Sequence, residues 1–196
     1  ISTGMASADE IKKTIKFYRE NNHNKLILLH CNSIYPPRDN QINLNNIKFF
    51  SQTLKTIVGY SDHTNDNYTA FASVLLGAKV IEKHITLNKK FKGPDHPFAI
   101  EPDEMKDLIF GVRKIEKSLG NFKRKLSLEE INNRKSIRRS LVAKTNINRN
   151  QKISEAHIKY ARPGTGLPTS KANKVIGKKA KKSIKAETLI KLNMVY

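Results

Sequence analysis

Two hydrophobic patterns alternate over residues 1–121. Residues 25–30 and 56–60 are short apolar runs bounded by polar residues, which is typical of buried strands in a parallel sheet. Residues 79–86 and the segment that begins at Ile1 also have the apolar character of strands. Apolar residues spaced by three and four follow each run, as in helices that bury one face. The pattern therefore predicts four strand–helix units in sequence and an α/β fold.

Local signals predict where these helices begin and end. Residues 7–10, Ser-Ala-Asp-Glu, form a capping box, and the helix behind it should end at the Asn-rich residues 21–24. A weaker helix is expected over residues 44–54 and another over residues 68–78. Pro102 suits the first position of the last helix, which Gly120 closes.

Four units cannot close an eight-stranded barrel, and an open half would leave strand edges and apolar surface exposed. The chain also begins at Ile1 without a methionine. We therefore expect a fragment of a larger barrel. After residue 121 the pattern shortens, which predicts a second, small, β-rich domain. A strand is expected over residues 140–146, a turn at 148–150, a loop at 162–168, and short strands near 175–177 and 183–190.

The formal net charge of +20 is what a nucleic-acid-binding protein would show. Lysines, however, occur along most of the chain, tryptophan is absent, and no nucleic-acid-binding motif accompanies them. Nucleic acid is therefore an unlikely partner, although an anionic substrate would benefit from the field. One cysteine, the lack of an apolar run of roughly 20 residues, and no visible targeting segment predict a cytoplasmic protein with no membrane span.

His63 and His84 each follow an apolar run, with a helix-like stretch between them. In a right-handed strand–helix–strand unit both imidazoles emerge at the same carboxyl end of the sheet, where a divalent transition metal could bind. Strand alternation directs Glu82 to the face of His84 and Asp62 away from the face of His63. The alternative is that each histidine is only a hydrogen-bonded residue at a strand end.

Five motifs in order along the chain resemble the N-acetylneuraminate (sialic acid) synthase family: residues 1–5 (Ile-Ser-Thr-Gly-Met), 30–36 (His-Cys-Asn-Ser-Ile-Tyr-Pro), 59–64 (Gly-Tyr-Ser-Asp-His-Thr), 81–84 (Ile-Glu-Lys-His) and 93–96 (Gly-Pro-Asp-His). Residues 140–143 and 162–166 are similar to the antifreeze-like (SAF) domain of these synthases. The resemblance implies that residues 1–121 are the C-terminal four units of a (β/α)₈ TIM barrel. Residues 122–136 would be a linker containing at most one helical turn, and residues 137–196 a SAF domain of the β-clip type.

The reaction implied by the resemblance is condensation of phosphoenolpyruvate with N-acetylmannosamine, which gives N-acetylneuraminate and phosphate. His63 and His84 match the family's metal ligands, with Mn²⁺ expected and Mg²⁺ or Co²⁺ as alternatives, and Glu82 is expected in the same catalytic site. Ser61 and Ser2 match phosphoenolpyruvate contacts.

Other matches concern the sugar and the partner subunit. Ser33 stands where many members carry an asparagine that contacts phosphoenolpyruvate, a departure from the family pattern. Tyr35 and Asp95 match residues that contact the acceptor sugar. Arg162 matches an arginine that crosses to the partner's sugar site in a homodimer with exchanged SAF domains.

Besides the neuraminate synthase, two other functions remain open at this point. Legionaminate, pseudaminate or a related synthase would use another N-acetylated sugar, and residues 93–96 favour the neuraminate and legionaminate branches without separating them. A different class of protein would be a non-catalytic module that binds polyanions. Because the family's phosphoenolpyruvate-binding lysines lie in the first four strands, residues 1–196 alone are expected to show little or no activity.

Overall fold

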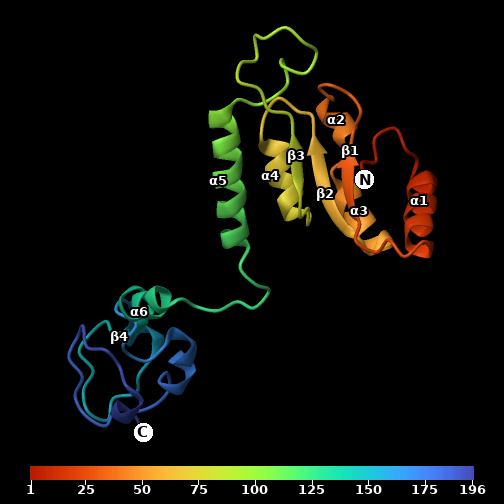
Figure 1. Cartoon of the computed structure of the whole chain (residues 1–196). Coiled ribbons are helices and arrows are strands. Elements are labelled where there is room, and N and C mark those ends of the chain that lie inside the picture. The colour runs from red at the N-terminus through yellow and green to blue at the C-terminus, as the bar shows by residue number, and fades with distance from the viewer. The chain divides into compact units, whose positions relative to one another are not determined.

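The computed structural model describes all residues 1–196. The chain forms two compact units, Ile1–Asn121 and Phe122–Tyr196, which are described separately (Figure 1). No helix in either unit combines the length and the apolar character that crossing a membrane requires.

The first unit contains a parallel sheet with the order β1-β2-β3. β1 (Ile27–Cys31) pairs with β2 (Ile57–Asp62), and β2 pairs with β3 (Ile81–Lys83). On the other side of β1, Ser2 forms an isolated parallel bridge with Leu29, which places the first residues beside this strand. The α/β character and the parallel pairing predicted from the sequence are therefore confirmed.

Helices follow each of these strand segments in order (Figure 1). They are α1 (Ala8–Glu20), α2 (Asp39–Ile42), α3 (Asn45–Leu54), α4 (Tyr68–Leu75) and α5 (Pro102–Leu119). Ser7 and Glu10 form the capping box at the start of α1, and Pro102 occupies the first turn of α5, both as predicted. The short helix α2 was not predicted.

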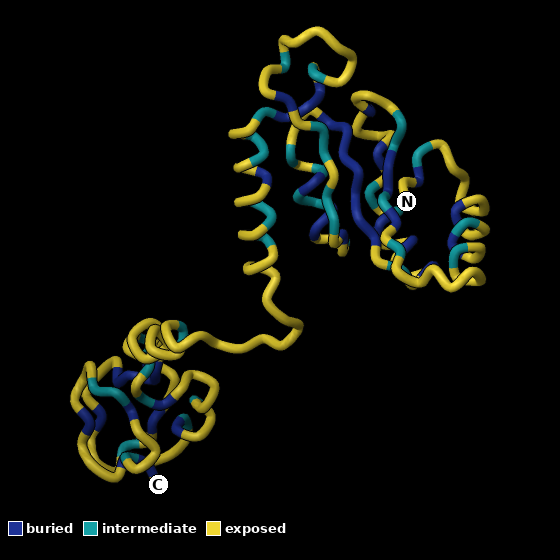
Figure 2. Tube along the Cα trace, in the orientation of Figure 1, coloured by how far each residue is buried: buried dark blue, intermediate teal, exposed yellow.

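The helices cover one face of the sheet, and the two faces differ in burial (Figure 2). Leu28 and Val58 join a core built from α1, α3, β1 and β2. On the opposite face Ile27 is 39% exposed and Ile57 is 53% exposed. Residues 25–30, expected to form a buried strand, are therefore not covered at Ile27 within this chain, and the exposed apolar side chains are of the kind expected for an open half barrel.

His30 is a buried polar residue of the helix-covered face. Its Nε2 lies 2.7 Å from the carbonyl oxygen of Ile42, and its ring stacks on Tyr60 with 5.9 Å between centroids. Burial lowers the pKa of His30 below its ordinary value, although the bond to Ile42 opposes the shift. His30 therefore serves packing and helix positioning in this unit.

The second unit has little regular structure. It contains α6 (Leu128–Ile137), an antiparallel pair of β4 (Ser140–Ala143) and β5 (Ile158–Ala161), and the 3-10 helices η1 (Glu155–His157), η2 (Thr169–Lys174) and η3 (Leu192–Met194). Its loops surround a separate core of aliphatic side chains, among them Leu141, Ile147, Ile153, Val175 and Ile190.

Three local expectations for this unit are corrected. Where at most one helical turn was expected in residues 122–136, the capping box of Ser127 and Glu130 begins a ten-residue helix, α6. No strand forms at residues 175–177 or 183–190; Ile184 and Leu189 make only isolated bridges, with Ile147 and Val142. Ile184 is buried and Leu189 half-buried, each with a single bridge, so the apolar pattern arises here without a ladder of strand pairs.

Candidate functional site

His63 and His84 lie next to each other just beyond the carboxyl ends of β2 and β3. Their ring centroids are 5.2 Å apart, with 64° between the ring planes. Tyr35, from the loop after β1, places its ring 4.2 Å from that of His63, and Phe98 lies 5.0 Å from His84. The sheet topology thus brings the two imidazoles together, and two aromatic rings flank them.

Ser61 and Glu82 complete this cluster from the same strands. They are paired in the sheet register, and the Ser61 hydroxyl donates to Glu82 Oε1 at 2.7 Å. The same hydroxyl oxygen is 3.4 Å from Nε2 of His63. Glu82 therefore lies on the face that strand alternation predicted, and the Ser61 hydroxyl lies between its carboxylate and His63.

A backbone carbonyl fixes the orientation of His63. Nδ1 of the ring is 2.8 Å from the carbonyl oxygen of Asn32, so Nδ1 must carry the proton in order to donate. Nε2 then presents a lone pair, and the only proton of the Ser61 hydroxyl points to Glu82, the closer acceptor. A neutral imidazole held in this way is the form in which histidine binds metals.

The donor set fits a divalent transition metal in part. Two imidazoles supply the nitrogen ligands that such ions prefer. The structure holds no group of three or more His, Cys, Asp and Glu side chains arranged to bind a metal ion. A metal held by His63 and His84 would therefore keep several positions open, as an ion that must bind substrate does.

Asp62 points away from the histidines, into a buried ion pair. Its Oδ2 is 2.8 Å from Nζ of Lys83, and both side chains are fully buried. Lys83 also donates to the carbonyl oxygens of Thr64, at 2.9 Å, and Asp66, at 2.7 Å. This ion pair fixes the loop that follows His63 to β3.

Tyr60 lies on the same face of β2 as Asp62. Burial raises the pKa of the Tyr60 phenol well above its ordinary value, and the negative charge of Asp62 adds to the shift. The phenol therefore stays protonated.

Asp95 lies in the long loop between β3 and α5. Its Oδ2 is 3.8 Å from Nδ1 of His84, and the carboxylate is largely exposed. An ion pair of 2.6 Å between Lys89 and Glu104 fastens this loop to α5, and the hydrogen bond from Lys89 lowers the pKa of Glu104. Asp95 is thus placed at the edge of the histidine cluster, on a loop with a fixed base.

Ser2 and Ser33 lie close to Gly4 rather than to the histidines. The Ser2 hydroxyl accepts a hydrogen bond from the Gly4 amide at 3.4 Å, and a Cβ at Gly4 would collide with the Ser33 hydroxyl. Ser33 lines a cavity of about 310 Å³ with Thr3 and Asn32. The structure thus gives these two serines a position of their own, without a contact to His63 or His84.

Arg162 belongs to the second unit. Its Nε donates to the carbonyl oxygen of Ile137, the last residue of α6, at 2.9 Å. The arginine therefore ties the loop after β5 to the end of that helix.

Three features of the site had not been predicted. Phe98, the carbonyl group of Asn32 and the Lys83 ammonium group all contact the predicted residues or hold them in place. Lys83 had a usable signal, because alternation puts it on the same side as the Asp62 carboxylate. The other two depend on loop conformation, which has no periodic pattern.

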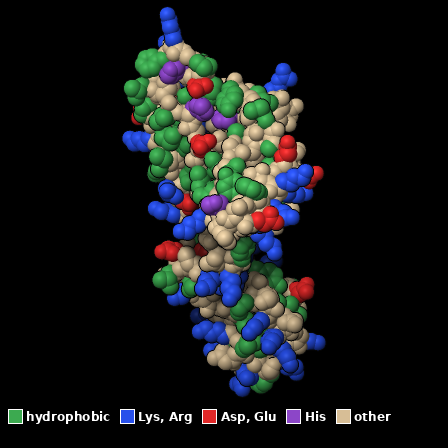
Figure 3. Space-filling model, turned by 45° about the vertical axis from the view of Figure 1, so that its right-hand side comes forward, with side chains coloured by type: hydrophobic (Ala, Val, Ile, Leu, Met, Phe, Trp, Pro, Cys, Tyr) green, Lys and Arg blue, Asp and Glu red, His purple; other side chains and the backbone are tan.

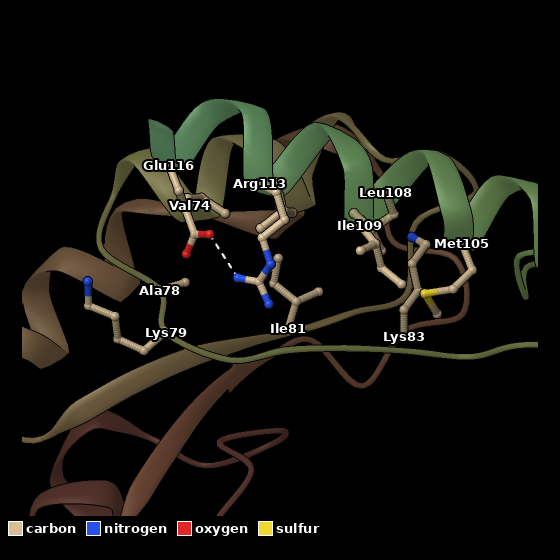
Figure 4. A pocket seen from close by; sticks show the side chains of 11 residues that line it. Val74, Ala78, Lys79, Ile81, Lys83, Met105, Leu108, Ile109, Arg113 and Glu116 are labelled. Carbon is tan, nitrogen blue, oxygen red and sulfur yellow. Dashed lines mark hydrogen bonds and ion pairs between the residues drawn. The ribbon is translucent and has the colours of Figure 1, made fainter. Parts of the chain in front are cut away.

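A further cavity, of about 220 Å³, lies between α4, β3 and α5 (Figure 4). Aliphatic side chains such as Val74, Ile81 and Leu108 line it, and the visible ion pair joins Arg113 to Glu116 at 2.8 Å. It contains no histidine and gathers no pair of groups suited to acid–base chemistry. The histidine cluster is therefore the candidate site.

Comparison with known proteins gives a consistent assignment for this geometry. The family model described as the NeuB family matches residues 1–124, and the SAF domain model matches residues 138–195. The chain is 38% identical over 193 residues to the N,N'-diacetyllegionaminic acid synthase of Campylobacter jejuni, covering 97% of this chain and 58% of that protein. It is 32% identical over 198 residues to the human N-acetylneuraminate-9-phosphate synthase, covering 100% of this chain and 55% of that protein.

Solved structures agree with this. The spore coat polysaccharide biosynthesis protein spsE of Bacillus subtilis matches with a TM-score of 0.58 and 28% identity, over 100% of this chain and 60% of that one. The N-acetylneuraminic acid synthetase of Leptospira borgpetersenii matches with a TM-score of 0.61 and 34% identity, over 69% and 48%. This chain thus spans little more than half the length of its relatives. It belongs to the NeuB family, and its C-terminal part is a SAF domain.

Proposed function

We propose that this chain is the C-terminal part of a nonulosonate synthase. The whole enzyme would condense phosphoenolpyruvate with the open-chain aldehyde of an N-acetylated hexosamine, giving a 2-keto acid and phosphate. Family membership supports this, since relatives are named as legionaminic, pseudaminic and N-acetylneuraminate-9-phosphate synthases. The observation that carries the proposal is the imidazole pair at adjacent strand ends, with His63 held in one tautomer.

His63 and His84 would hold a divalent cation, with Mn²⁺ as the first expectation and Mg²⁺ or Co²⁺ as alternatives. A cation bound there would act as a Lewis acid on the aldehyde oxygen. The Asn32 carbonyl group keeps the His63 lone pair directed to this position. The aromatic rings of Tyr35 and Phe98 lie against the two histidines beside this position.

Glu82 and Ser61 would act on the reacting groups. The Glu82 carboxylate accepts a hydrogen bond from the Ser61 hydroxyl and so orients this hydroxyl beside His63. As a base, it could receive a proton from a bound water or hydroxyl group. Ser2 and Ser33 at neighbouring strand ends would donate to the oxygens of phosphoenolpyruvate, and Ser61 would join them when its proton turns from Glu82 to the ligand. Because Ser2 and Ser33 lie near Gly4, their contacts would be to a different part of the ligand from that held by Ser61.

Tyr35 and Asp95 would contact the sugar. Both are exposed at the edge of the cluster, where an acceptor could reach the histidines. Asp95 offers a carboxylate for sugar hydroxyls, and Tyr35 offers a ring face. In a homodimer with exchanged SAF domains, Arg162 would reach the sugar of the partner subunit.

The exposed amino ends of β1 and β2 suit a half barrel that another half covers. Ile27 and Ile57 lie on the face without helices, and β3 has a free edge in this chain. We assign residues 1–121 to the C-terminal half of a (β/α)₈ barrel on this basis. The N-terminal half would supply the remaining strands and the further groups that bind phosphoenolpyruvate.

N-acetylmannosamine is the first candidate acceptor, and a 2,4-diacetamido sugar is the second. Two relatives named N,N'-diacetyllegionaminic acid synthase, at 38% and 35% identity, favour the second.

The test is mass-spectrometric product detection with the complete reading frame that encodes this chain. The enzyme would be given phosphoenolpyruvate, Mn²⁺ and, in separate reactions, N-acetylmannosamine, its 2,4-diacetamido-6-deoxy analogue and the pseudaminate precursor. A keto acid from one sugar, lost on chelation, would support the proposal and identify the acceptor. Absence of a product from all three sugars with a folded, metal-loaded enzyme would contradict it.

A further inference from the structure

The two units differ strongly in charge. Of the 37 Lys and Arg residues 20 lie in residues 122–196, but only 4 of the 17 Asp and Glu residues do, which gives this part a formal net charge of +16. Lysine and arginine side chains are scattered over the visible face of this unit, with few acidic ones between them (Figure 3). Such a field attracts anions, but the charge alone does not define a site.

A cleft of about 470 Å³ within this unit concentrates cationic groups. It is lined by basic residues of α6 and of the segment before β4 and by two hydroxyl residues of η2: Arg134, Lys135, Arg138, Arg139, Thr169 and Ser170. No acidic side chain lines the cleft. Every side chain that bears a charge or a hydroxyl group in it can therefore donate to an anion.

The four cations of this cleft have no carboxylate partner. The nearby Glu130 pairs with Arg124 at 2.7 Å, and Glu187 pairs with Lys159 at 2.5 Å. Arg134 lies in the last turn of α6 and Arg138 is the residue that follows this helix, so two like charges that line the same cleft repel each other. A bound anion would relieve this repulsion.

The backbone under these cations is fixed by close packing. The Gly164 amide donates to the carbonyl oxygen of Lys135 at 2.8 Å. A Cβ at Gly164 would lie only 2.7 Å from Cβ of Arg138. Together with the bond from Arg162 to Ile137, these contacts hold the end of α6 against the loop after β5. The cleft is thus formed before any ligand binds.

We propose that this cleft of the SAF domain binds the phosphate group of a small phosphorylated molecule. A guanidinium group can donate two parallel hydrogen bonds to phosphate oxygens, and Arg134 at the end of α6 and Arg138 just after it both line this cleft. The Thr169 and Ser170 hydroxyl groups line the same cleft and can donate to the remaining phosphate oxygens. A concave cleft suits a compact ligand, whereas a nucleic acid strand requires an extended cationic groove with aromatic side chains for stacking. This site is independent of the proposed synthase reaction.

The test compares two double variants that remove the same charge. R134Q/R138Q removes two cations of the cleft. K178Q/K182Q removes two exposed lysines of the same unit that do not line it. Binding of inorganic phosphate and of pyrophosphate to residues 1–196 would be measured by calorimetry at constant ionic strength. We expect the first variant to weaken pyrophosphate binding at least tenfold and the second to change it less than twofold.

Other outcomes would overturn the proposal. Equal losses in both double variants would show diffuse charge attraction only, and no measurable binding of phosphate or pyrophosphate to the unchanged chain would remove the site. Preferential binding of a 12-nucleotide RNA, weakened equally by both variants, would make the surface a nucleic-acid interface instead. If R134Q/R138Q does not fold, T169V/S170A tests the two hydroxyl groups of the cleft, and an unchanged affinity of that variant for pyrophosphate would contradict the proposal.

Discussion

At the residue scale, the candidate site depends on side chains that hold other side chains. Alternation along β2 and β3 predicted that Glu82 and Asp62 point to opposite faces, and the geometry agrees. The fixed tautomer of His63 could not be predicted, because a loop carbonyl group, that of Asn32, determines it. Loop backbones carry no periodic signal, so sequence patterns identify the two histidines but not what orients them.

Lys83→Met is expected to destabilise the first unit. The change leaves the Asp62 carboxylate buried without its cation and removes the donor to the Thr64 and Asp66 carbonyl oxygens. Breaking a buried pair in this way costs about 3–5 kcal/mol of unfolding free energy. Hydrogen exchange of β2 amides measures this loss.

The double variant Lys83→Met/Asp62→Asn should recover part of the lost stability, because the uncompensated charge is removed. If the Lys83→Met variant differs from the unchanged chain by less than about 0.5 kcal/mol, roughly the scatter of an ordinary surface substitution, the role of Lys83 is wrong.

His30 should make the first unit less stable in mild acid. Because burial lowers its pKa in the folded state, the unfolded chain binds the proton more readily. The stability from neutral His30 is thus complete above the unfolded pKa of about 6.5 and is lost as the pH falls below it. Hydrogen exchange of β1 amides at pH 7.5 and 5.5 should show this loss.

His30→Gln is the control for that effect. Glutamine can still donate to the Ile42 carbonyl oxygen but does not titrate, so the difference in protection between the two pH values should shrink. The same pH difference in the variant and in the unchanged chain would show that other groups cause it.

At the scale of elements, the sequence predicts helices better than it predicts the irregular second unit. The capping box of α1 and the proline of α5 mark where their helices begin, because the box pairs free N–H groups of the first turn and proline has no N–H to leave unpaired. The apolar residues near Val175 and Ile184 looked like strands but pack through 3-10 turns and single bridges. A small core can be built from loops, and sequence periodicity does not distinguish apolar residues in such loops from apolar residues in strands.

Gly111 is a test of how α4 and α5 pack. A Cβ at this position would collide with the ring of Phe71 on α4. Alanine is favoured over glycine in a helix by about 1 kcal/mol, but overpacking costs about 1–3 kcal/mol, so Gly111→Ala should lower the melting temperature. Adding Phe71→Leu, which makes room for the methyl group, should restore part of it. A stabilised Gly111→Ala variant would show that the helices do not meet at this residue.

At the scale of the whole molecule, the sequence pattern indicates that lysines are spread along most of the chain. Basic residues do occur in both units, but the acidic residues that balance them lie mainly in the first. The separation appears when the charges are counted on each side of the boundary between Asn121 and Phe122. The same boundary explains why the resemblance to a two-domain family could be detected from short motifs in each part.

The most direct test of the proposed enzyme is the effect of the histidine pair on turnover. In the complete reading frame, His63→Ala and His84→Ala should each lower kcat by about 10³-fold, since a lost Lewis acid costs several kcal/mol of transition-state stabilisation. His23→Ala, at an exposed position after α1, should leave kcat unchanged. If the histidine variants fold and retain kcat within a factor of two or so of the unchanged enzyme, a difference of under about 0.5 kcal/mol, the proposed role of His63 and His84 is wrong.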